Sequence, residues 1–277
     1  MADWRPMLIR RNDGFPRIMG VLNLTPDSFH EASRLDSTES AVSRAITMVE
    51  QGADWIDIGG ESTRPGAVSV DTEEEVSRVV PVVRAVREAL PRICISIDTR
   101  RAIVASKSLD AGADMVNDVS ALSDPEMARL VARRSCPICV MHMQGTPEKM
   151  QNDPSYQDVV DDVRSSLDKA VTALKELGVD PSVVIADPGI GFGKTLEHNL
   201  SLLSSGREVV PDDRMSLMWG VSRKSMFAHL LGRESTDHRL AGTLGVAARA
   251  KDKGVDIIRV HDVAEHADMF AAMGALR

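Results

Sequence analysis

One short phrase recurs four times along the chain and constrains the fold more than any other feature. It consists of glycine, a small apolar residue and aspartate, followed by a short β-rich run, and it occurs at residues 52–58, 112–117, 178–185 and 254–260. The glycine can adopt the left-handed conformation that ends a helix. The run after it is apolar and nearly unbroken, which is typical of a strand buried on both faces. Each phrase therefore predicts the passage from a helix into a buried strand.

The same pattern extends to eight strands, each followed by a helical stretch. The predicted strands are Ile18–Leu22, Trp55–Ile58, Ile93–Ile97, Met115–Val116, Ile138–Met141, Val183–Ala186, Ser216–Val221 and Ile257–Val260. The clearest amphipathic helices are Ser40–Gln51, Thr72–Ala89, Tyr156–Leu177 and Leu240–Lys253. Alternating strands and helices predict a parallel sheet, and eight repeats in about 250 residues favour an α/β fold closed as a (β/α)8 TIM barrel. An open doubly wound sheet is the alternative. No linker rich in Pro, Gly or Ser divides the chain, so we expect a single domain over residues 1–277.

Polar side chains follow the predicted strands at their carboxyl ends. They are Asn23, Asp98, Asn117, His142, Asp187, Ser222-Arg223-Lys224, Arg259 and His261. In a parallel barrel these ends converge on one face, where active sites form. Each Asp or Asn taken alone could simply cap the next helix. Capping does not explain Lys224, Arg259 and His261, so the set as a whole indicates a site.

The residue types in this set indicate the class of ligand. Asp and Asn offer paired acceptors and donors, which suit a heterocycle with an amidine-like edge. Arg and Lys suit an anion or the face of a flat ring. Together Asn23, Arg259 and His261 could hold a polyphosphate, with a metal ion neutralising part of its charge. The pattern therefore predicts a flat nitrogen heterocycle that carries a phosphate group.

The charge balance and the cysteines narrow the partners and the compartment. The chain has 33 basic and 41 acidic residues and a net charge of −8, which disfavours nucleic acid as a partner. No uncharged apolar run is long enough for a membrane helix, and we expect no signal peptide. Three cysteines in 277 residues do not form a disulfide framework, so a cytoplasmic protein is expected.

Several local motifs invite interpretations that their spacing does not support. Residues 188–195, Pro-Gly-Ile-Gly-Phe-Gly-Lys-Thr, match neither the P-loop nor the dinucleotide-binding fingerprint, and we interpret them as a flexible turn that brings backbone close to a ligand. The Cys-x-x-Cys at 136–139 has no second pair and is interpreted as part of a strand. Residues 141–143, Met-His-Met, are interpreted as packing with a histidine at the strand end. The acidic run at 73–75 fits the first turn of a helix and is assigned no chemistry. The long segments 23–29 and 59–66 are interpreted as loops that close over a substrate.

Eight motifs in order identify a family. The chain resembles the dihydropteroate synthases of the folate pathway from Ile18 to Ala272. The motifs are Asn-Leu-Thr-Pro-Asp-Ser-Phe at 23–29, Asp-Ile-Gly-Gly-Glu-Ser-Thr-Arg-Pro-Gly at 57–66, Ser-Ile-Asp-Thr at 96–99, Asn-Asp-Val-Ser at 117–120, Met-His-Met-Gln-Gly-Thr-Pro at 141–147, Asp-Pro-Gly-Ile-Gly-Phe-Gly-Lys at 187–194, Ser-Arg-Lys-Ser at 222–225 and Arg-Val-His-Asp at 259–262.

The resemblance implies a dimeric (β/α)8 barrel that joins 6-hydroxymethyl-7,8-dihydropterin diphosphate to p-aminobenzoate and releases diphosphate in the presence of Mg2+. By this resemblance the pterin edge contacts Asp98, Asn117, Asp187 and Lys224, and Arg259 stacks on the pterin face. The diphosphate is held by Asn23, Arg259 and His261, with Asn23 near Mg2+. The p-aminobenzoate contacts Thr63, Arg64 and Ser225, with Phe29, Pro65 and Phe192 around it. The expected catalytic residues are Asp98, Asp187, Lys224, Arg259 and His261.

As a mechanism we expect early loss of diphosphate, a delocalised pterin cation stabilised by anionic Asp98 and Asp187, and attack by the aniline nitrogen.

One departure from the family pattern lies at residues 30–33, His-Glu-Ala-Ser, where the family often has Ser-Asp-Gly-Gly. This segment is similar to that of the mobile synthases that confer sulfonamide resistance, which suggests an altered response to these drugs. Two alternatives stay open: a folate-dependent methyltransferase on the same barrel, and a paralogue that binds pterins without catalysis.

Overall fold

A computed structural model of the chain describes residues 3–24, 34–62, 70–146 and 149–276. Its parallel strands pair in sequence order and close into a barrel, with the last strand beside the first. The strands are β1 Arg17–Asn23, β2 Trp55–Gly59, β3 Cys94–Asp98, β4 Met115–Asp118, β5 Ile138–Met141, β6 Val184–Asp187, β7 Ser216–Trp219 and β8 Ile257–Val260. The predicted TIM barrel is confirmed, and the open sheet is excluded.

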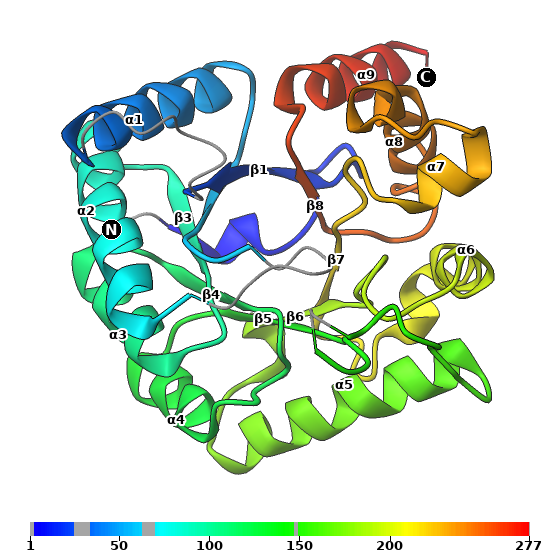
Figure 1. Ribbon diagram of the computed structural model, residues 1–277, viewed down its shortest axis with the longest axis horizontal. Coiled ribbons are helices and arrows are strands. Elements are labelled where there is room, and N and C mark those ends of the chain that lie inside the picture. The colour runs from blue at the N-terminus through cyan, green and yellow to red at the C-terminus, as the bar shows by residue number, and fades with distance from the viewer. Residues whose placement is uncertain (1–2, 25–33, 63–69, 147–148, 277) are drawn as a thin grey trace.

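Helices ring the barrel on its outside (Figure 1). They are α1 Arg34–Glu50, α2 Thr72–Ala89, α3 Ala102–Ala111, α4 Pro125–Arg134, α5 Val159–Glu176, α6 Leu196–Ser205, α7 Met226–Leu231, α8 Leu240–Ala247 and α9 Val263–Ala275. The predicted bounds of α2 are confirmed; there the Asp71 side chain caps the first turn by accepting the N–H of Glu73. The prediction for α8 is too long, because the helix ends at Ala247 and turns follow it. No helix in these described ranges is long and apolar enough to cross a membrane.

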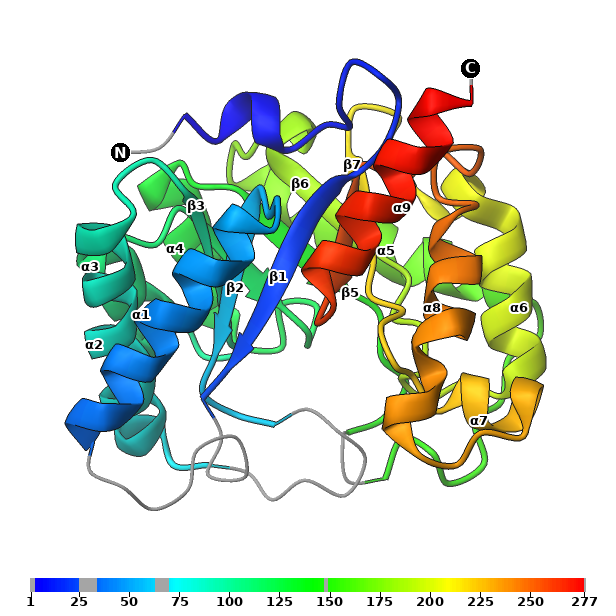
Figure 2. The same ribbon diagram turned by 90° about the horizontal axis from the view of Figure 1, so that it is seen from above.

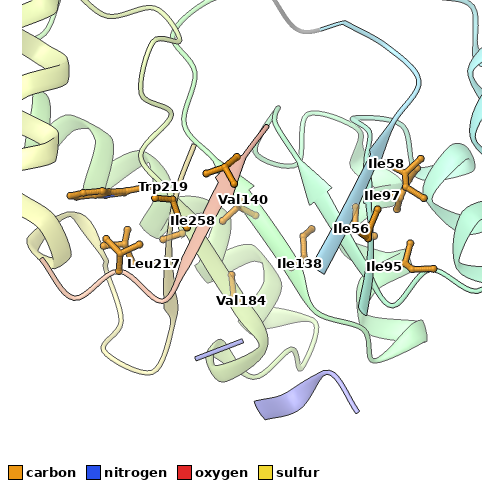
Figure 3. Close-up of a cluster of buried hydrophobic side chains, with 14 of the residues drawn as sticks. Ile56, Ile58, Ile95, Ile97, Ile138, Val140, Val184, Leu217, Trp219 and Ile258 are labelled. Carbon is orange, nitrogen blue, oxygen red and sulfur yellow. The ribbon is translucent and has the colours of Figure 1, made fainter. Parts of the chain in front are cut away.

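Alternate residues of each strand point to opposite sides of the barrel wall. The outward-facing residues, such as Ile56 and Ile58 on β2 and Ile95 and Ile97 on β3, pack under the helices in the main core (Figure 3). A second, smaller apolar cluster lies inside the barrel. It contains Leu8, Met19, Trp55, Cys94, Met115, Cys139, Ile185, Met218 and Ile257. The N-terminal segment, with the short 3-10 helix η1 (Arg5–Met7), crosses the amino end of the strands (Figure 2), and the Trp55 indole donates a hydrogen bond to the Met7 carbonyl at 3.0 Å.

The recurring Gly-x-Asp phrase has a physical explanation at this amino end. All four glycines have positive φ, as the sequence predicts: Gly52, Gly112, Gly178 and Gly254. Three of the aspartates each accept a backbone N–H of the preceding strand, in the pairs Asp54–Ile18, Asp114–Ile95 and Asp256–Leu217, each at 2.9 Å. The same carboxylates also form ion pairs, with Arg17, Arg87 and Arg207 respectively. These hydrogen bonds and ion pairs hold neighbouring strands together at the amino end of the barrel, away from the predicted site.

Candidate active site

The interior of the barrel changes from apolar to polar along the strands. Above the apolar layer, the next inward-facing residues are Asp57, Ser96, Asp98, Asn117, Asp187 and Arg259, and all but the arginine are buried. Strand alternation places them there, because each follows an inward-facing apolar residue at a spacing of two or four. The structure thus brings together Asp98, Asn117, Asp187 and Arg259, as the sequence predicts.

Arg259 is the centre of this group. Its Nε lies 2.6 Å from Asp57 Oδ2, and its Nη2 lies 2.8 Å from Asp98 Oδ2. The amide of Asn117 donates to the same Asp57 oxygen at 3.2 Å. Asp57 lies in the motif at 57–66 but was not among the predicted site residues; its position two residues after Trp55 was the signal that it faces inward. The two carboxylates raise the pKa of Arg259 further above its ordinary value, against the opposing effect of burial.

Burial acts on the two predicted catalytic carboxyls in the same direction. It raises the pKa of Asp98, which Arg259 lowers and Asp57 raises further. Burial also raises the pKa of Asp187, against a hydrogen bond from the Gly189 N–H and the charges of Lys224 and Arg259. Without a ligand, each carboxyl is thus shifted toward its neutral form. A positive charge arriving beside them would favour the anions expected from the sequence.

Glycines lie next to both carboxyls. A Cβ on Gly59, at the end of β2, would lie 3.4 Å from the Cβ of Asp98, and one on Gly220, after β7, would lie 3.7 Å from Asp187 Oδ2. Three buried polar atoms nearby have no hydrogen-bond partner in the described ranges: Asp57 Oδ1, Ser96 Oγ and Asn117 Oδ1. Unpartnered acceptors and a donor beside these carboxyls suit a ligand that carries both kinds of group.

The loop after β6 packs on the end of β5. Gly189, Gly191 and Gly193 all have positive φ, and a Cβ on Gly189 would lie 1.9 Å from the His142 carbonyl oxygen. The glycines therefore allow backbone to lie against backbone, and the approach of this turn to a ligand stays a prediction. Phe192 in the same loop lies under Lys224, whose Nζ is 3.9 Å from the ring centroid.

Lys194 is a buried lysine that the sequence analysis did not select. Its Nζ lies 3.0 Å from His142 Nδ1 and donates to the carbonyl oxygens of Phe192 at 3.0 Å and His142 at 3.4 Å. Burial lowers the pKa of Lys194 to about 7, and burial with the nearby lysine lowers that of His142 to about 3. His142 packs as predicted, and its specific partner is Lys194. The glycine-rich run before Lys194 was the one sequence signal that pointed to this lysine.

The loops after β7 and β8 hold the remaining described candidates. His261 donates its N–H to Ser222 Oγ at 3.1 Å, and its Nδ1 lies 2.9 Å from the same oxygen. Ser225 is exposed at the start of α7. Asn23 is half-buried at the end of β1, opposite Gly59. Phe29, Thr63, Arg64 and Pro65 lie outside the described residues, as does the segment 30–33.

Glu61 and Val70 are hydrogen-bonded to each other and to arginines that follow β3. Glu61 accepts the Val70 N–H at 2.9 Å and pairs with Arg100 and Arg101, while Arg101 donates to the Val70 carbonyl at 2.6 Å. Burial would raise the pKa of Glu61, but these hydrogen bonds outweigh it and lower the pKa. Arg101 also pairs with Glu75, which is fully buried. The acidic run at 73–75 therefore includes one structural ion pair that helix-dipole reasoning missed.

The described ranges contain no cluster of three His, Cys, Asp or Glu side chains that would bind a metal ion. Cys139 lies in β5 as predicted, whereas Cys136 lies before the strand begins. Both are buried free thiols, and burial raises the pKa of Cys136 to about 11, which disfavours the thiolate that redox or metal chemistry requires. Asn23 supplies a single neutral oxygen. That donor suits Mg2+, which in phosphate sites takes most of its ligands from substrate oxygens and water.

Comparison with known proteins agrees with this geometry. Residues 19–261 match the family model described as pterin binding enzyme. The dihydropteroate synthase of Synechocystis sp. is 44% identical over 262 residues, which cover 94% of this chain and 89% of the relative. That of Escherichia coli K12 is 42% identical over 250 residues, covering 90% and 88%.

Solved structures give the same result. A Yersinia pestis dihydropteroate synthase in complex with a sulfonamide drug superposes with a TM-score of 0.88 at 38% identity, covering 96% of each chain. A dihydropteroate synthase from Xanthomonas albilineans in complex with 7,8-dihydropteroate has a TM-score of 0.85 at 34% identity, covering 96% of this chain and 95% of that one.

Proposed function

Since this chain belongs to the pterin-binding enzyme family, as a dihydropteroate synthase, we propose how its residues divide the work of joining 6-hydroxymethyl-7,8-dihydropterin diphosphate to p-aminobenzoate. One observation carries the proposal: Asp98, Asn117, Asp187 and Arg259 meet inside the carboxyl end of the barrel. The pterin edge would lie against Asp98, Asn117, Asp187 and Lys224. Asp57 Oδ1, Ser96 Oγ and Asn117 Oδ1, which have no partner among the described residues, support a ring that carries both donors and acceptors at this level.

Arg259 has two roles in this proposal, and its present contacts constrain them. Its Nε remains on Asp57, which anchors the guanidinium, while Nη2 leaves Asp98 so that this carboxyl can face the ring. The guanidinium plane then covers the pterin face, and its outer edge reaches the diphosphate with Asn23 and His261. Mg2+ held by Asn23 and the diphosphate would neutralise part of the negative charge of the leaving group.

The C–O bond to diphosphate breaks first, and the electron pair leaves with the diphosphate. The resulting pterin cation is stabilised by Asp98 and Asp187, whose raised pKa values fall as positive charge develops beside them. The aniline nitrogen of p-aminobenzoate then forms the C–N bond and loses a proton. Ser225 and the segment with Phe29, Thr63, Arg64 and Pro65 would hold p-aminobenzoate, with Phe192 at its side.

The deciding experiment is release of diphosphate by the purified chain with Mg2+. We expect release that depends on both substrates, and a loss of at least about 100-fold in kcat for Asp98→Ala and Lys224→Ala. Arg64→Ala should chiefly raise KM for p-aminobenzoate. A methyltransferase would release no diphosphate, and a pterin-binding paralogue would bind the pterin without turnover. Near-normal turnover in both Asp98→Ala and Lys224→Ala would refute the residue assignment.

We further propose a homodimer formed through α6 and α7. Leu200 on α6 and Leu230 and Leu231 on α7 are exposed, and the two helices lie in contact. Adjacent exposed leucines favour a protein interface. Light scattering should give twice the chain mass, and Leu230→Glu with Leu231→Glu should give monomers.

For the location in the cell we propose the cytoplasm, where the three free thiols would stay reduced.

A further inference from the structure

Arg223 has an unusual backbone conformation between two parts of the proposed site. Its φ is +55°, in the left-handed region that side chains other than Gly and Asn rarely adopt. The chain direction changes there so that Arg223 and Lys224 reach opposite neighbours. Lys224 lies over Phe192 in the loop after β6, whereas the Arg223 guanidinium lies on Asp262, after β8.

The polar groups of Arg223 contact residues between β7 and α9, and its Nη1 lies 3.5 Å from the exposed Asp237. Its N–H donates to Thr243 Oγ1 at 3.0 Å, and its carbonyl accepts from Arg239 at 3.2 Å. Its Nε and Nη2 donate to the two oxygens of Asp262, with the Nε contact at 2.9 Å, and the Asp262 side chain is only 9% exposed. Such a two-point contact fixes orientation as well as distance.

These contacts continue a strand pairing that ends early. The β7–β8 ladder comprises only Met218 with Ile257 and Trp219 with Ile258. Beyond it no backbone pairing joins the two strands, but Ser222 binds His261 and Arg223 binds Asp262. Two consecutive residues of one loop thus hold two consecutive residues of the other.

We propose that Arg223 is a positioning residue that fixes the β7 loop, with Lys224 and Ser225, relative to Arg259 and His261. The inference rests on the proposed function, in which one loop contacts the pterin and p-aminobenzoate and the other holds the diphosphate. Because the reacting carbon lies between these groups, a change in their separation misplaces the leaving group relative to the amine. Displacements of this kind, of about 1 Å, typically lower rates about 100-fold.

The test compares Arg223→Met, Arg223→Lys, Asp262→Asn and the double variant Arg223→Met/Asp262→Asn. The control is Arg129→Met, which removes an exposed ion pair with Glu126 on α4. For each protein we would measure kcat, both KM values, diphosphate binding by calorimetry and unfolding in urea. We expect Arg223→Met and Asp262→Asn each to lower kcat about 10- to 100-fold in protein that is fully folded, and to weaken diphosphate binding. Arg223→Lys, which keeps the charge but loses the two-point contact, should recover only part of kcat.

Two results would overturn the inference. One is an unchanged kcat and an unchanged diphosphate affinity in folded Arg223→Met. The other is a double variant whose loss equals the product of the single losses, because a shared contact can be lost only once. The wild-type assay decides the proposed function separately: if wild type binds diphosphate but releases none from the two substrates, the function fails while diphosphate binding by the variants still decides the role of Arg223.

Discussion

Replacing Lys194 with methionine should change how stability depends on pH. The amine has a pKa of about 7 in the folded protein, mainly through burial, against a reference value of 10.5. Above pH 10.5 it is neutral in both folded and unfolded chains. Between pH 10.5 and 7 only the unfolded chain is protonated, so the wild type loses stability as pH falls through this window. Below pH 7 both states are protonated, and the loss stays constant.

The size of this effect follows from the shift of 3.5 pH units. At about 1.4 kcal/mol per pH unit, the full loss is about 5 kcal/mol, and roughly 3 to 4 kcal/mol of it falls between pH 10 and pH 7. Methionine removes this dependence but leaves His142 Nδ1 and two carbonyl oxygens without their donor. Each orphaned acceptor costs about 1–3 kcal/mol at all pH values. The lost hydrogen bonds therefore change the free energy of unfolding by the same amount at every pH. The slope of the free energy of unfolding against pH reports only the titration of the amine.

The assay is urea unfolding of wild type and Lys194→Met at several pH values from 7 to 10. The free energy of unfolding of the variant relative to wild type should rise by roughly 3 to 4 kcal/mol as pH falls from 10 to 7. Lys169→Met, which removes an exposed lysine of α5, serves as the control for the loss of a lysine. A difference between variant and wild type that varies by less than about 1 kcal/mol over this range would show that Lys194 stays charged when folded, and the argument from burial would be wrong.

Four further predictions test other parts of the structure. His142→Gln should lose less stability than wild type as pH falls from 6.5 to 3. In that window the unfolded imidazole binds a proton, whereas the folded one, with its pKa lowered to about 3, does not. Free energies of unfolding that fall in parallel with pH for the two proteins would contradict this. Gly189→Ala should cost at least about 3 kcal/mol in urea unfolding, whereas Gly178→Ala, with φ +83° and open space around its Cβ, should cost only about 1 kcal/mol; equal costs would refute the close packing. Asp57→Asn should destabilise the protein by about 3 kcal/mol and lower kcat, since Arg259 loses its anchor; unchanged kcat would remove Asp57 from the site. Restoring Ser-Asp-Gly-Gly at residues 30–33 should change the inhibition constant of a sulfonamide, and identical constants would remove the idea of an altered drug response.

The barrel could be predicted from sequence because its signals are local. A glycine that ends a helix, followed by a short apolar run, specifies one unit, and eight units leave few ways to close a parallel sheet. The carboxyl-end residues Asp98, Asn117 and Asp187 were predictable for the same reason, because each directly follows such a run. Strand ends shifted by one or two residues, because pairing with the neighbouring strand sets them; β4 extends to Asp118 by pairing with β5.

The contacts that the sequence did not predict all join distant segments. Asp57 and Arg259 are 202 residues apart, and Lys194 meets His142 across 52 residues. No local period marks such pairs, because the closed barrel brings them together only after every strand has its place. The inward orientation of Asp57 could have been predicted from strand alternation. By contrast, the ion pair of Glu75 could not, because helix-dipole reasoning explained all three glutamates of its run equally well.

The charges inside the barrel explain why chemistry that passes through a cation suits this fold. Asp57 and Asp98 pair with Arg259, and the charges of Lys224 and Arg259 act on Asp187. Burial is nevertheless the largest influence on Asp98 and Asp187, and it raises the pKa of both carboxyls, so each is shifted toward its neutral form before a cation is present. In the proposed reaction, a ring that becomes positive as diphosphate leaves offsets the cost of burying these charges and favours both carboxyls as anions. The stabilisation is thus greatest when the cation forms, which is the condition for accelerating the step rather than only binding the substrate.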